Sequence, residues 1–274
     1  MPPIPDTIIP GNRIKQTLHD GGSVIGTMLV EIRQPSVMQL LANAGFDFVL
    51  IDTEHGPFNI ETVADLSRAA RQLGITPIVR IPEITYTAVT QPLDAGAQGI
   101  MIPRVTDVHQ VREALGMMKY APIGRRGSVL SRGHTGFKSG PVDSAMNQAN
   151  EESMLVVQIE TAQILERLDE ILSVPGIDAA LIGPNDLSIA LGVPGKMNDQ
   201  KLVAAIEKSM EACNRHNVVA AIHMNELPLA VEWARRGMRM VSFNSEAGLL
   251  MKSGQESVTA IRAMKRQPAE NNGS

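Results

Sequence analysis

Cysteine and aromatic residues are scarce in this chain of 274 residues. The single cysteine, Cys213, excludes a disulfide within the chain and a zinc site built from several cysteines. Only one Trp, two Tyr and five Phe are present, and acidic residues outnumber basic ones by 29 to 25. Neither stacking surfaces nor an excess of positive charge therefore favours nucleic-acid binding, and we expect no nucleic-acid partner.

Long apolar segments are also missing. No uninterrupted apolar run approaches the ~20 residues that span a membrane, and residues 1–16 lack the charged start and apolar core of a secretory signal. We therefore expect a cytoplasmic protein with no membrane partner. Apolar residues make up 43% of the chain and charged residues 20%, as in ordinary globular proteins. We expect one domain over 1–274, with a flexible polar tail at 267–274.

Short apolar runs alternate with amphipathic stretches along nearly the whole chain. The runs predict eight strands, at 24–28, 46–51, 77–81, 99–102, 155–159, 179–182, 219–222 and 240–243. Apolar spacings of three and four predict helices at 60–73, 108–118, 164–172, 202–216 and 227–236. Strands that are apolar at successive positions are buried on both faces, as in parallel sheets. Eight such units in about 250 residues favour an α/β (β/α)8 TIM barrel over the alternative, a doubly wound sheet.

The active site of such a barrel lies at the carboxyl ends of its strands. In this sequence those ends carry carboxylates, an imidazole and a guanidinium. The residues are Asp52, Glu54 and His55 after the second strand, Arg80 after the third, Glu160 after the fifth and Asp186 after the sixth. Any one of them could be polar only because it meets water. Arg80 and Glu160, however, directly follow buried-looking runs, so their charges need partners.

Glu160 and Asp186 are the natural pair to bind a metal ion. Two carboxylates without cysteine or clustered histidine suit a hard divalent cation such as Mg²⁺ or Mn²⁺. The alternative is that one carboxylate caps a helix or pairs with an arginine, since Asp186 precedes the helical-looking Leu187–Ala190. Backbone N–H groups at 183–186, where that helix would begin, are also expected to bind a substrate carboxylate.

His55 is the best candidate for a general base, because Asp52 and Glu54 stand beside it and could orient the ring. His223, at the end of the seventh strand, is the second choice. None of the eight lysines ends a predicted strand, so a Schiff-base mechanism is disfavoured. Glycine-rich nucleotide-binding loops are absent as well, which argues against a nucleotide cofactor.

Residues 120–152 stand outside the alternation, with several glycines and three arginines, Arg125, Arg126 and Arg132. Loops of this length are usually functional or disordered. The segment follows the fourth helix of the barrel, so its start should lie opposite the active site. We expect that it either crosses to a neighbouring subunit or forms a solvated surface loop.

At these positions the sequence resembles the HpcH/HpaI-type metal-dependent (class II) pyruvate aldolases. The matching motifs run in order through nearly the entire chain. They are AGFDFVLIDTEHGP (44–57), PIVR (77–80), LDAGAQGIMIP (93–103), YAPIGRRG (120–127), VQIET (157–161) and IGPNDLS (182–188).

The resemblance implies a (β/α)8 barrel of the phosphoenolpyruvate/pyruvate-binding type, assembled as a trimer or hexamer with an exchanged terminal helix. It implies cleavage of a 4-hydroxy-2-oxo acid to pyruvate and an aldehyde through a metal-bound enolate, with Mg²⁺, Mn²⁺ or Co²⁺ held by Glu160 and Asp186. His55 would be the acid/base, helped by an acid such as Asp52 or Asp94, and Arg80 would steady the enolate oxygen. The implied pyruvate site comprises Gln158, Gly183, Pro184, Asn185 and Asp186.

Two strand ends depart from the family pattern. Met28 stands where an aromatic residue is expected, and residues 242–246 (SFNSE) replace a small glycine-containing turn. Both ends border the pocket, so the acceptor aldehyde is left open. One alternative is an enzyme like macrophomate synthase, which decarboxylates oxaloacetate and couples the resulting enolate. Another is a barrel that binds a keto acid without turnover.

Overall fold

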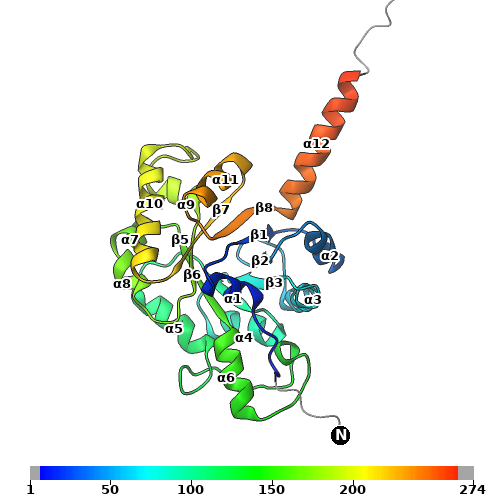
Figure 1. Ribbon diagram of the computed structural model, residues 1–274, viewed down its shortest axis with the longest axis vertical. Coiled ribbons are helices and arrows are strands. Elements are labelled where there is room, and N and C mark those ends of the chain that lie inside the picture. The colour runs from blue at the N-terminus through cyan, green and yellow to red at the C-terminus, as the bar shows by residue number, and fades with distance from the viewer. Residues whose placement is uncertain (1–6, 265–274) are drawn as a thin grey trace, which may run out of the picture.

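The computed structural model describes residues 7–264 and contains a closed barrel of eight parallel strands (Figure 1). The tail predicted at 267–274 lies outside the described residues. Each strand pairs with the next, and β1 also pairs with β8, which closes the barrel and rules out a doubly wound sheet. The strands are β1 (Val24–Leu29), β2 (Phe48–Asp52), β3 (Thr76–Arg80), β4 (Gly99–Ile102), β5 (Met154–Ile159), β6 (Ala179–Ile182), β7 (Val219–Met224) and β8 (Met240–Ser245). All eight predicted strands are confirmed.

Helices follow the strands and surround the barrel (Figure 1). They are α1 (Arg13–His19), α2 (Ser36–Asn43), α3 (Ile60–Gln72), α4 (Tyr86–Ala95), α5 (Val108–Met118), α6 (Val142–Glu152), α7 (Ala162–Glu166), α8 (Leu168–Leu172), α9 (Pro184–Ala190), α10 (Gln200–Arg215), α11 (Leu227–Arg235) and α12 (Glu246–Met264). The helix predicted at 164–172 is wrong as one element, because Arg167 leaves helical geometry and separates α7 from α8. No helix within 7–264 is long and apolar enough to cross a bilayer.

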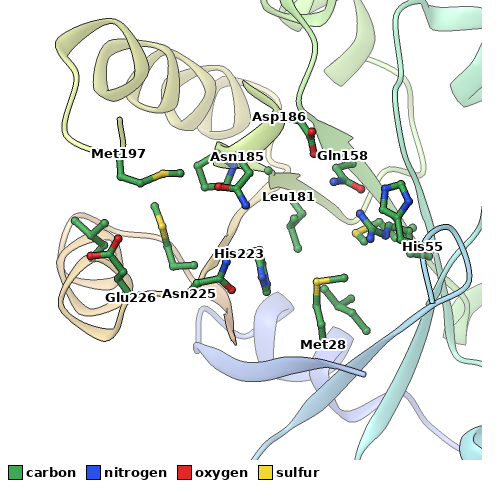
Figure 2. Close-up of a pocket in the computed structure, with 17 residues that line it drawn as sticks. Met28, His55, Gln158, Leu181, Asn185, Asp186, Met197, His223, Asn225 and Glu226 are labelled. Atoms are coloured by element: carbon green, nitrogen blue, oxygen red, sulfur yellow. The ribbon is translucent and has the colours of Figure 1, made fainter. Parts of the chain in front are cut away.

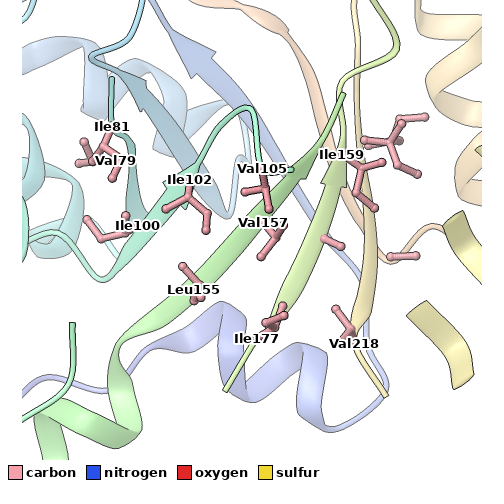
Figure 3. Close-up of a cluster of buried hydrophobic side chains, with 14 of the residues drawn as sticks. Val79, Ile81, Ile100, Ile102, Val105, Leu155, Val157, Ile159, Ile177 and Val218 are labelled. Carbon is pink, nitrogen blue, oxygen red and sulfur yellow. The ribbon is translucent and has the colours of Figure 1, made fainter. Parts of the chain in front are cut away.

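Alternate side chains of each strand enter two different cores. Phe48 and Ile78 belong to a cluster that fills the barrel. Their neighbours Val49 and Val79 belong to a larger cluster between the strands and the helices, part of which is drawn in Figure 3. A Cβ at Gly26 would lie 2.5 Å from the Phe48 ring. Glycine is therefore needed in β1 for the barrel interior to close around Phe48.

The long segment at 120–152 packs at least partly on its own chain. A short 3₁₀ turn, η1 (Gly133–Thr135), lies against α4, and Arg71 of α3 donates hydrogen bonds to the carbonyls of Gly133 and His134 at 2.8 and 3.0 Å. The segment also contains α6, which we did not predict because its helix is largely polar. The segment is therefore not irregular along its whole length, and both expected alternatives, a crossing to a neighbouring subunit and a solvated surface loop, stay predictions.

The last helix, α12, extends away from the barrel (Figure 1). Only Glu246, at its first position, is buried. The Glu246 carboxylate accepts hydrogen bonds from the backbone N–H groups of Val30, Glu31 and Ile32, which fastens the start of the helix to the loop after β1. The rest of α12 leaves large apolar side chains exposed, among them Leu250, Ile261 and Met264.

Candidate active site

A cavity of about 280 Å³ opens at the carboxyl ends of the strands (Figure 2). The polar side chains that line it come from several strand ends, as expected for a barrel. They are His55, Arg80, Gln158, Asn185, Asp186, His223, Asn225 and Glu226. Met28, Leu50, Met101 and Leu181 line the apolar part. Five residues predicted for the site from the sequence, together with Gly183 and Pro184, therefore share one cavity.

On the β2–β3 side, Asp52 and Arg80 form a buried bidentate ion pair. Arg80 Nε lies 2.9 Å from Asp52 Oδ1, and Arg80 Nη2 lies 2.5 Å from Asp52 Oδ2. Burial acts to raise the pKa of Asp52, but the hydrogen bonds and charge of Arg80 outweigh it, so the pKa is lowered. The pKa of Arg80 is raised by the same pair in spite of its burial. Both groups are charged, and Asp52 fixes the direction of the guanidinium.

Glu54 joins three basic groups at this side. Its side chain is only 6% exposed, and its carboxylate lies 3.4 Å from Arg80 Nη1 and 3.1 Å from Arg104 Nε. His55 Nε2 lies 3.9 Å away. The sequence predicted Glu54 only as a possible orienting acid. It did not predict Arg104, which reaches the site from the β4 end with a left-handed φ of 51°.

The imidazole of His55 is accessible to a bound molecule. Its side chain is 71% exposed and lies at the cavity opposite the β7 end (Figure 2). Asp52 does not hold the ring: Asp52 Oδ1 accepts the backbone N–H groups of Glu54 and His55, at 3.0 and 3.3 Å. Asp52 therefore positions the backbone of the turn that carries His55 and, contrary to the expectation from the sequence, does not contact the imidazole. Glu54 is the carboxylate nearest the ring.

On the β5–β6 side, Glu160 is buried without a cationic side chain at ion-pair distance among residues 7–264. Its Oε1 accepts the backbone N–H of Arg104 at 2.7 Å, and its Oε2 accepts Gln158 Nε2 at 2.5 Å. Burial raises the pKa of Glu160; the charges of Asp186 and Glu54 raise it further, against the Arg104 N–H and the Arg80 charge. Gln158 Oε1 is buried and has no hydrogen-bond partner in the described chain.

Asp186 lies in the first turn of α9, where its side chain is exposed to the cavity. It forms no ion pair and does not cap the helix within the described chain. The absence of a side chain at Gly183 leaves room for the side chains of Gln158 and Glu160. A Cβ at this position would lie 3.1 Å from Gln158 Nε2 and 3.3 Å from Glu160 Oε2. The anion site expected at 183–186 is smaller than predicted. Gly183 N–H already donates to Ile159 and Pro184 has no N–H, which leaves Asn185 and Asp186.

His223, the second candidate base, is partly buried on β7. Its Nδ1 lies 2.9 Å from Ser242 Oγ on β8. Burial lowers the pKa of His223 to about 4, with Arg80 acting in the same direction and Asn225 and Asp52 against it. The ring is therefore uncharged at neutral pH and lines the cavity as a neutral hydrogen-bonding group.

Asp94 is not brought to this cavity by its own chain. It lies near the end of α4, where Arg126 Nη2 from the long segment approaches its Oδ1 to 2.5 Å. The Arg126 side chain is only 3% exposed and stacks over the Tyr120 ring. Within the described chain Asp94 therefore anchors the 120–152 segment, and the acid/base role that the family resemblance implies for it stays a prediction.

No group of three or more His, Cys, Asp or Glu within residues 7–264 is arranged to hold a metal ion without outside ligands. Any cation held by Glu160 and Asp186 must take further ligands from water, substrate or an uncharged oxygen. Such an open coordination shell is usual for Mg²⁺, which keeps several waters.

A sequence profile of the HpcH/HpaI aldolase/citrate lyase family matches residues 27–252. The chain is 35% identical over 251 residues to 4-hydroxy-2-oxo-heptane-1,7-dioate aldolase of Salmonella paratyphi C, an alignment that covers 91% of this chain and 94% of the relative. The crystal structure of an HpcH/HpaI aldolase from Desulfitobacterium hafniense DCB-2 superposes with a TM-score of 0.87 at 32% identity, covering 94% and 98% of the two chains.

Macrophomate synthase is a more distant neighbour, with a TM-score of 0.82 at 28% identity over 94% of this chain and 92% of the other. The predicted resemblance is confirmed, because the profile and the relatives each span most of the sequence. This chain belongs to the HpcH/HpaI aldolase/citrate lyase family.

Proposed function

We propose that this chain is a carbon–carbon lyase that cleaves a 4-hydroxy-2-oxo acid to pyruvate and an aldehyde, and catalyses the reverse condensation, with the help of a divalent cation. The family includes aldolases and citrate lyases, so membership alone supports only a lyase or aldolase. The finer assignment rests on one observation: the buried carboxylate of Glu160, which has no ion-pair partner in the described chain, lies within electrostatic reach of Asp186, and Asp186 lines the same cavity as Arg80.

The residues on the β5–β6 side fit a hard divalent cation. The pKa of Glu160 is raised by burial and by the neighbouring Asp186, so a bound cation would stabilise its ionised form. Gln158 Oε1, which is buried and has no hydrogen-bond partner within residues 7–264, supplies an uncharged oxygen of the kind that hard cations accept. Glu160 and Asp186 would hold an Mg²⁺, Mn²⁺ or Co²⁺ ion, which when bound would supply positive charge to the keto-acid oxygens and so acidify the neighbouring C–H bond.

The protein groups divide the remaining work. The N–H groups of Asn185 and Asp186 bind the substrate carboxylate. Arg80, fixed by Asp52, directs its guanidinium toward the keto oxygen, where negative charge develops as the enolate of pyruvate forms. In the cleavage direction His55 accepts the proton of the 4-hydroxyl as the C3–C4 bond breaks. In the condensation direction the same ring returns that proton to the aldehyde oxygen.

Exchange of the pyruvate methyl protons with solvent deuterium tests this proposal without an aldehyde. We expect exchange with Mg²⁺, Mn²⁺ or Co²⁺, none after exhaustive chelation with EDTA, and recovery when an ion is returned. Cleavage of a 4-hydroxy-2-oxo acid should show the same dependence. Undiminished activity after chelation, or covalent trapping by borohydride, would contradict the proposal and indicate a lysine Schiff base.

Similarity to macrophomate synthase supports one alternative, the decarboxylation of oxaloacetate with coupling of its enolate. The same preparation distinguishes the two activities. A protein that releases CO₂ from oxaloacetate but cleaves no hydroxy-oxo acid belongs to the second class. A protein that exchanges no proton of pyruvate and turns over neither substrate would instead be a keto-acid-binding barrel.

We also propose that the chain forms a homo-oligomer through α12. Apart from its first residue this helix leaves the barrel and exposes apolar side chains that include Leu250, Met251 and Ile261, at 61–68% of their full surface. A helix whose apolar side chains are exposed in the described chain gains stability when those side chains pack on a second copy. Sedimentation at micromolar concentration should show a trimer or hexamer, with residues 120–140 protected from protease. A fully active monomer would refute this assembly.

A further inference from the structure

We infer that the β7 side of the cavity selects a small, uncharged, hydroxylated aldehyde, which it recognises through the imidazole of His223 and the amide of Asn225. The inference rests on the proposed function, because it concerns the acceptor of that reaction. In the condensation, pyruvate loses one C3 proton to give the enolate, and C3 then forms one bond to the aldehyde carbon. The π bond of the aldehyde carbonyl breaks, and its oxygen takes up one proton.

The cavity extends well beyond the groups that would bind the keto acid. His55 and Gln158 lie at one end, and His223, Asn225 and Glu226 lie across from them at the end of β7 (Figure 2). None of these three β7-side groups has a task in the formation of the enolate. The aldehyde whose carbonyl carbon is attacked by C3 of the pyruvate enolate needs space next to the keto acid, and this end of the cavity supplies it.

His223 and Asn225 form a neutral pair that can both donate and accept hydrogen bonds. The pKa of His223, about 4, leaves the ring with one N–H and one unprotonated nitrogen at neutral pH. The Ser242 hydroxyl, itself fully buried, holds the ring at Nδ1. A hydroxyl group is the smallest substituent that donates and accepts at once, so it satisfies this pair, whereas a methyl group displaces water from these polar atoms without replacing its hydrogen bonds.

The charges of the cavity disfavour an anionic acceptor. Arg80 is the only lysine or arginine among the cavity-lining residues of the described chain, and it belongs to the keto-acid end. At the β7 end the single charged group is the Glu226 carboxylate. An aldehyde that carries its own carboxylate would therefore meet a like charge and no compensating cation. Met197, Met224 and Leu229 complete this wall and suit a short carbon chain.

Glycolaldehyde and propionaldehyde test the inference as a matched pair, since they differ only in OH against CH₃. We would measure kcat/KM for condensation of each with pyruvate in the presence of Mn²⁺, and compare the ratio between variants. Dividing the ratio of a variant by that of the wild type cancels the intrinsic reactivity of the two aldehydes. It also cancels any change in the amount of folded protein, which protects the test against a partly unfolded variant.

His223→Leu should lower the glycolaldehyde/propionaldehyde ratio about 10-fold, the effect of losing one hydrogen bond to the hydroxyl of glycolaldehyde. Asn225→Ala should lower it in the same direction. His19→Leu makes the same substitution at a histidine whose side chain is 83% exposed outside the cavity, and it should leave the ratio unchanged. A ratio that stays at the wild-type value in both His223→Leu and Asn225→Ala overturns the inference.

The charge argument has its own measurement. Glu226→Gln should raise kcat/KM for glyoxylate, an anionic aldehyde, about threefold relative to glycolaldehyde, because one like charge is removed. No change in that ratio would show that Glu226 does not select against anions, and would overturn this part of the inference.

Exchange of the pyruvate methyl protons, run on the same samples without aldehyde, separates the two possible failures. If exchange proceeds and the aldehyde ratios do not respond to the variants, only the inference about the acceptor is wrong. If no divalent ion supports exchange, the proposed function is wrong, and the inference falls with it.

Discussion

The two sides of the cavity shift the pKa values of their buried carboxylates in opposite directions. On the β2–β3 side, Asp52 meets Arg80 in a bidentate pair, and its pKa is lowered in spite of burial. On the β5–β6 side, Glu160 has no such partner in the described chain, and burial together with neighbouring acids raises its pKa. The two residues lie at the ends of strands in the same barrel and differ mainly in the supply of positive charge.

The difference indicates what each side is built to do. The β2–β3 side carries its own cation, so it is complete in the folded chain and can hold the turn with His55 in place. The β5–β6 side keeps two acids together without neutralising them, which costs stability unless a cation arrives from solution. We therefore assign charge supplied by the protein to the first side and charge supplied by an ion to the second.

Removing the acids of the β5–β6 side should have the largest effect. Glu160→Gln and Asp186→Asn should each abolish metal-dependent exchange of the pyruvate methyl protons, because the cation loses half of its charged ligands. Glu160→Gln should also make the metal-free protein more stable at neutral pH, since the raised pKa of Glu160 means that its ionisation is unfavourable in the fold. Deuterium exchange measures the loss of activity, and thermal unfolding with and without Mn²⁺ measures the stability of the protein and its stabilisation by the ion. A variant stabilised by Mn²⁺ as much as the wild type would count against the assignment.

His55→Ala tests the chemistry held by the β2–β3 side. Cleavage of a hydroxy-oxo acid should slow by ~10²–10⁴-fold, the usual contribution of a general base. Metal binding should be unaffected, because His55 is not among the proposed ligands. Steady-state rates and Mn²⁺ titration on one preparation provide the comparison. A loss of Mn²⁺ affinity would show that His55 takes part in metal binding and would contradict its assignment to the β2–β3 side.

Asp52→Asn should act on stability. Breaking the buried bidentate pair leaves Arg80 with only the longer contact to Glu54 and should cost up to about 3–5 kcal/mol of unfolding free energy at neutral pH. Because the folded pKa of Asp52 lies below its ordinary value of 3.8, its contribution is present above pH 3.8 and is lost as the pH falls through the folded pKa. Urea unfolding at pH 7 and near pH 3 should therefore show a gap between variant and wild type that narrows in acid. A gap of equal size at both pH values would mean that the Asp52 charge is not what stabilises the fold.

Arg104→Ala should have the smallest effect. Its guanidinium is 64% exposed, so the ion pair with Glu54 is worth no more than about 1 kcal/mol. The backbone N–H that Glu160 accepts is retained in the variant. Exchange of pyruvate protons should stay within a fewfold of the wild type, and a large loss would show that the Arg104 side chain itself takes part.

The strands and their polar ends could be predicted from the sequence because parallel barrel strands are buried on both faces. Runs such as residues 48–51 and 155–157 then have no polar interruption, and the first charged residue marks the end of the strand. Helices carried a weaker signal. The missed α4 contains Pro92, and α6 is largely polar, so neither shows a clean apolar stripe.

The partners within the site could not be predicted in the same way. Asp52 was expected to orient the imidazole of His55, but residue 80 lies opposite it in the β2–β3 register, and the pairing with Arg80 follows from that register. The side chain of Arg104 contacts Glu54 and its backbone N–H donates to Glu160, and both contacts depend on a left-handed backbone conformation that no sequence motif predicts. Such contacts depend on which strands are neighbours and on a few dihedral angles, which single-sequence patterns do not encode.

Calorimetric titration of the metal-free protein with Mn²⁺ tests most directly the claim that the β5–β6 side, and not the β2–β3 side, binds the cation. The account predicts one site per chain in the wild type, retention of that site in His55→Ala and in Asp52→Asn where the fold persists, and its loss in Glu160→Gln. Undiminished Mn²⁺ binding by Glu160→Gln would contradict the claim that the β5–β6 side is where this barrel takes its positive charge from solution.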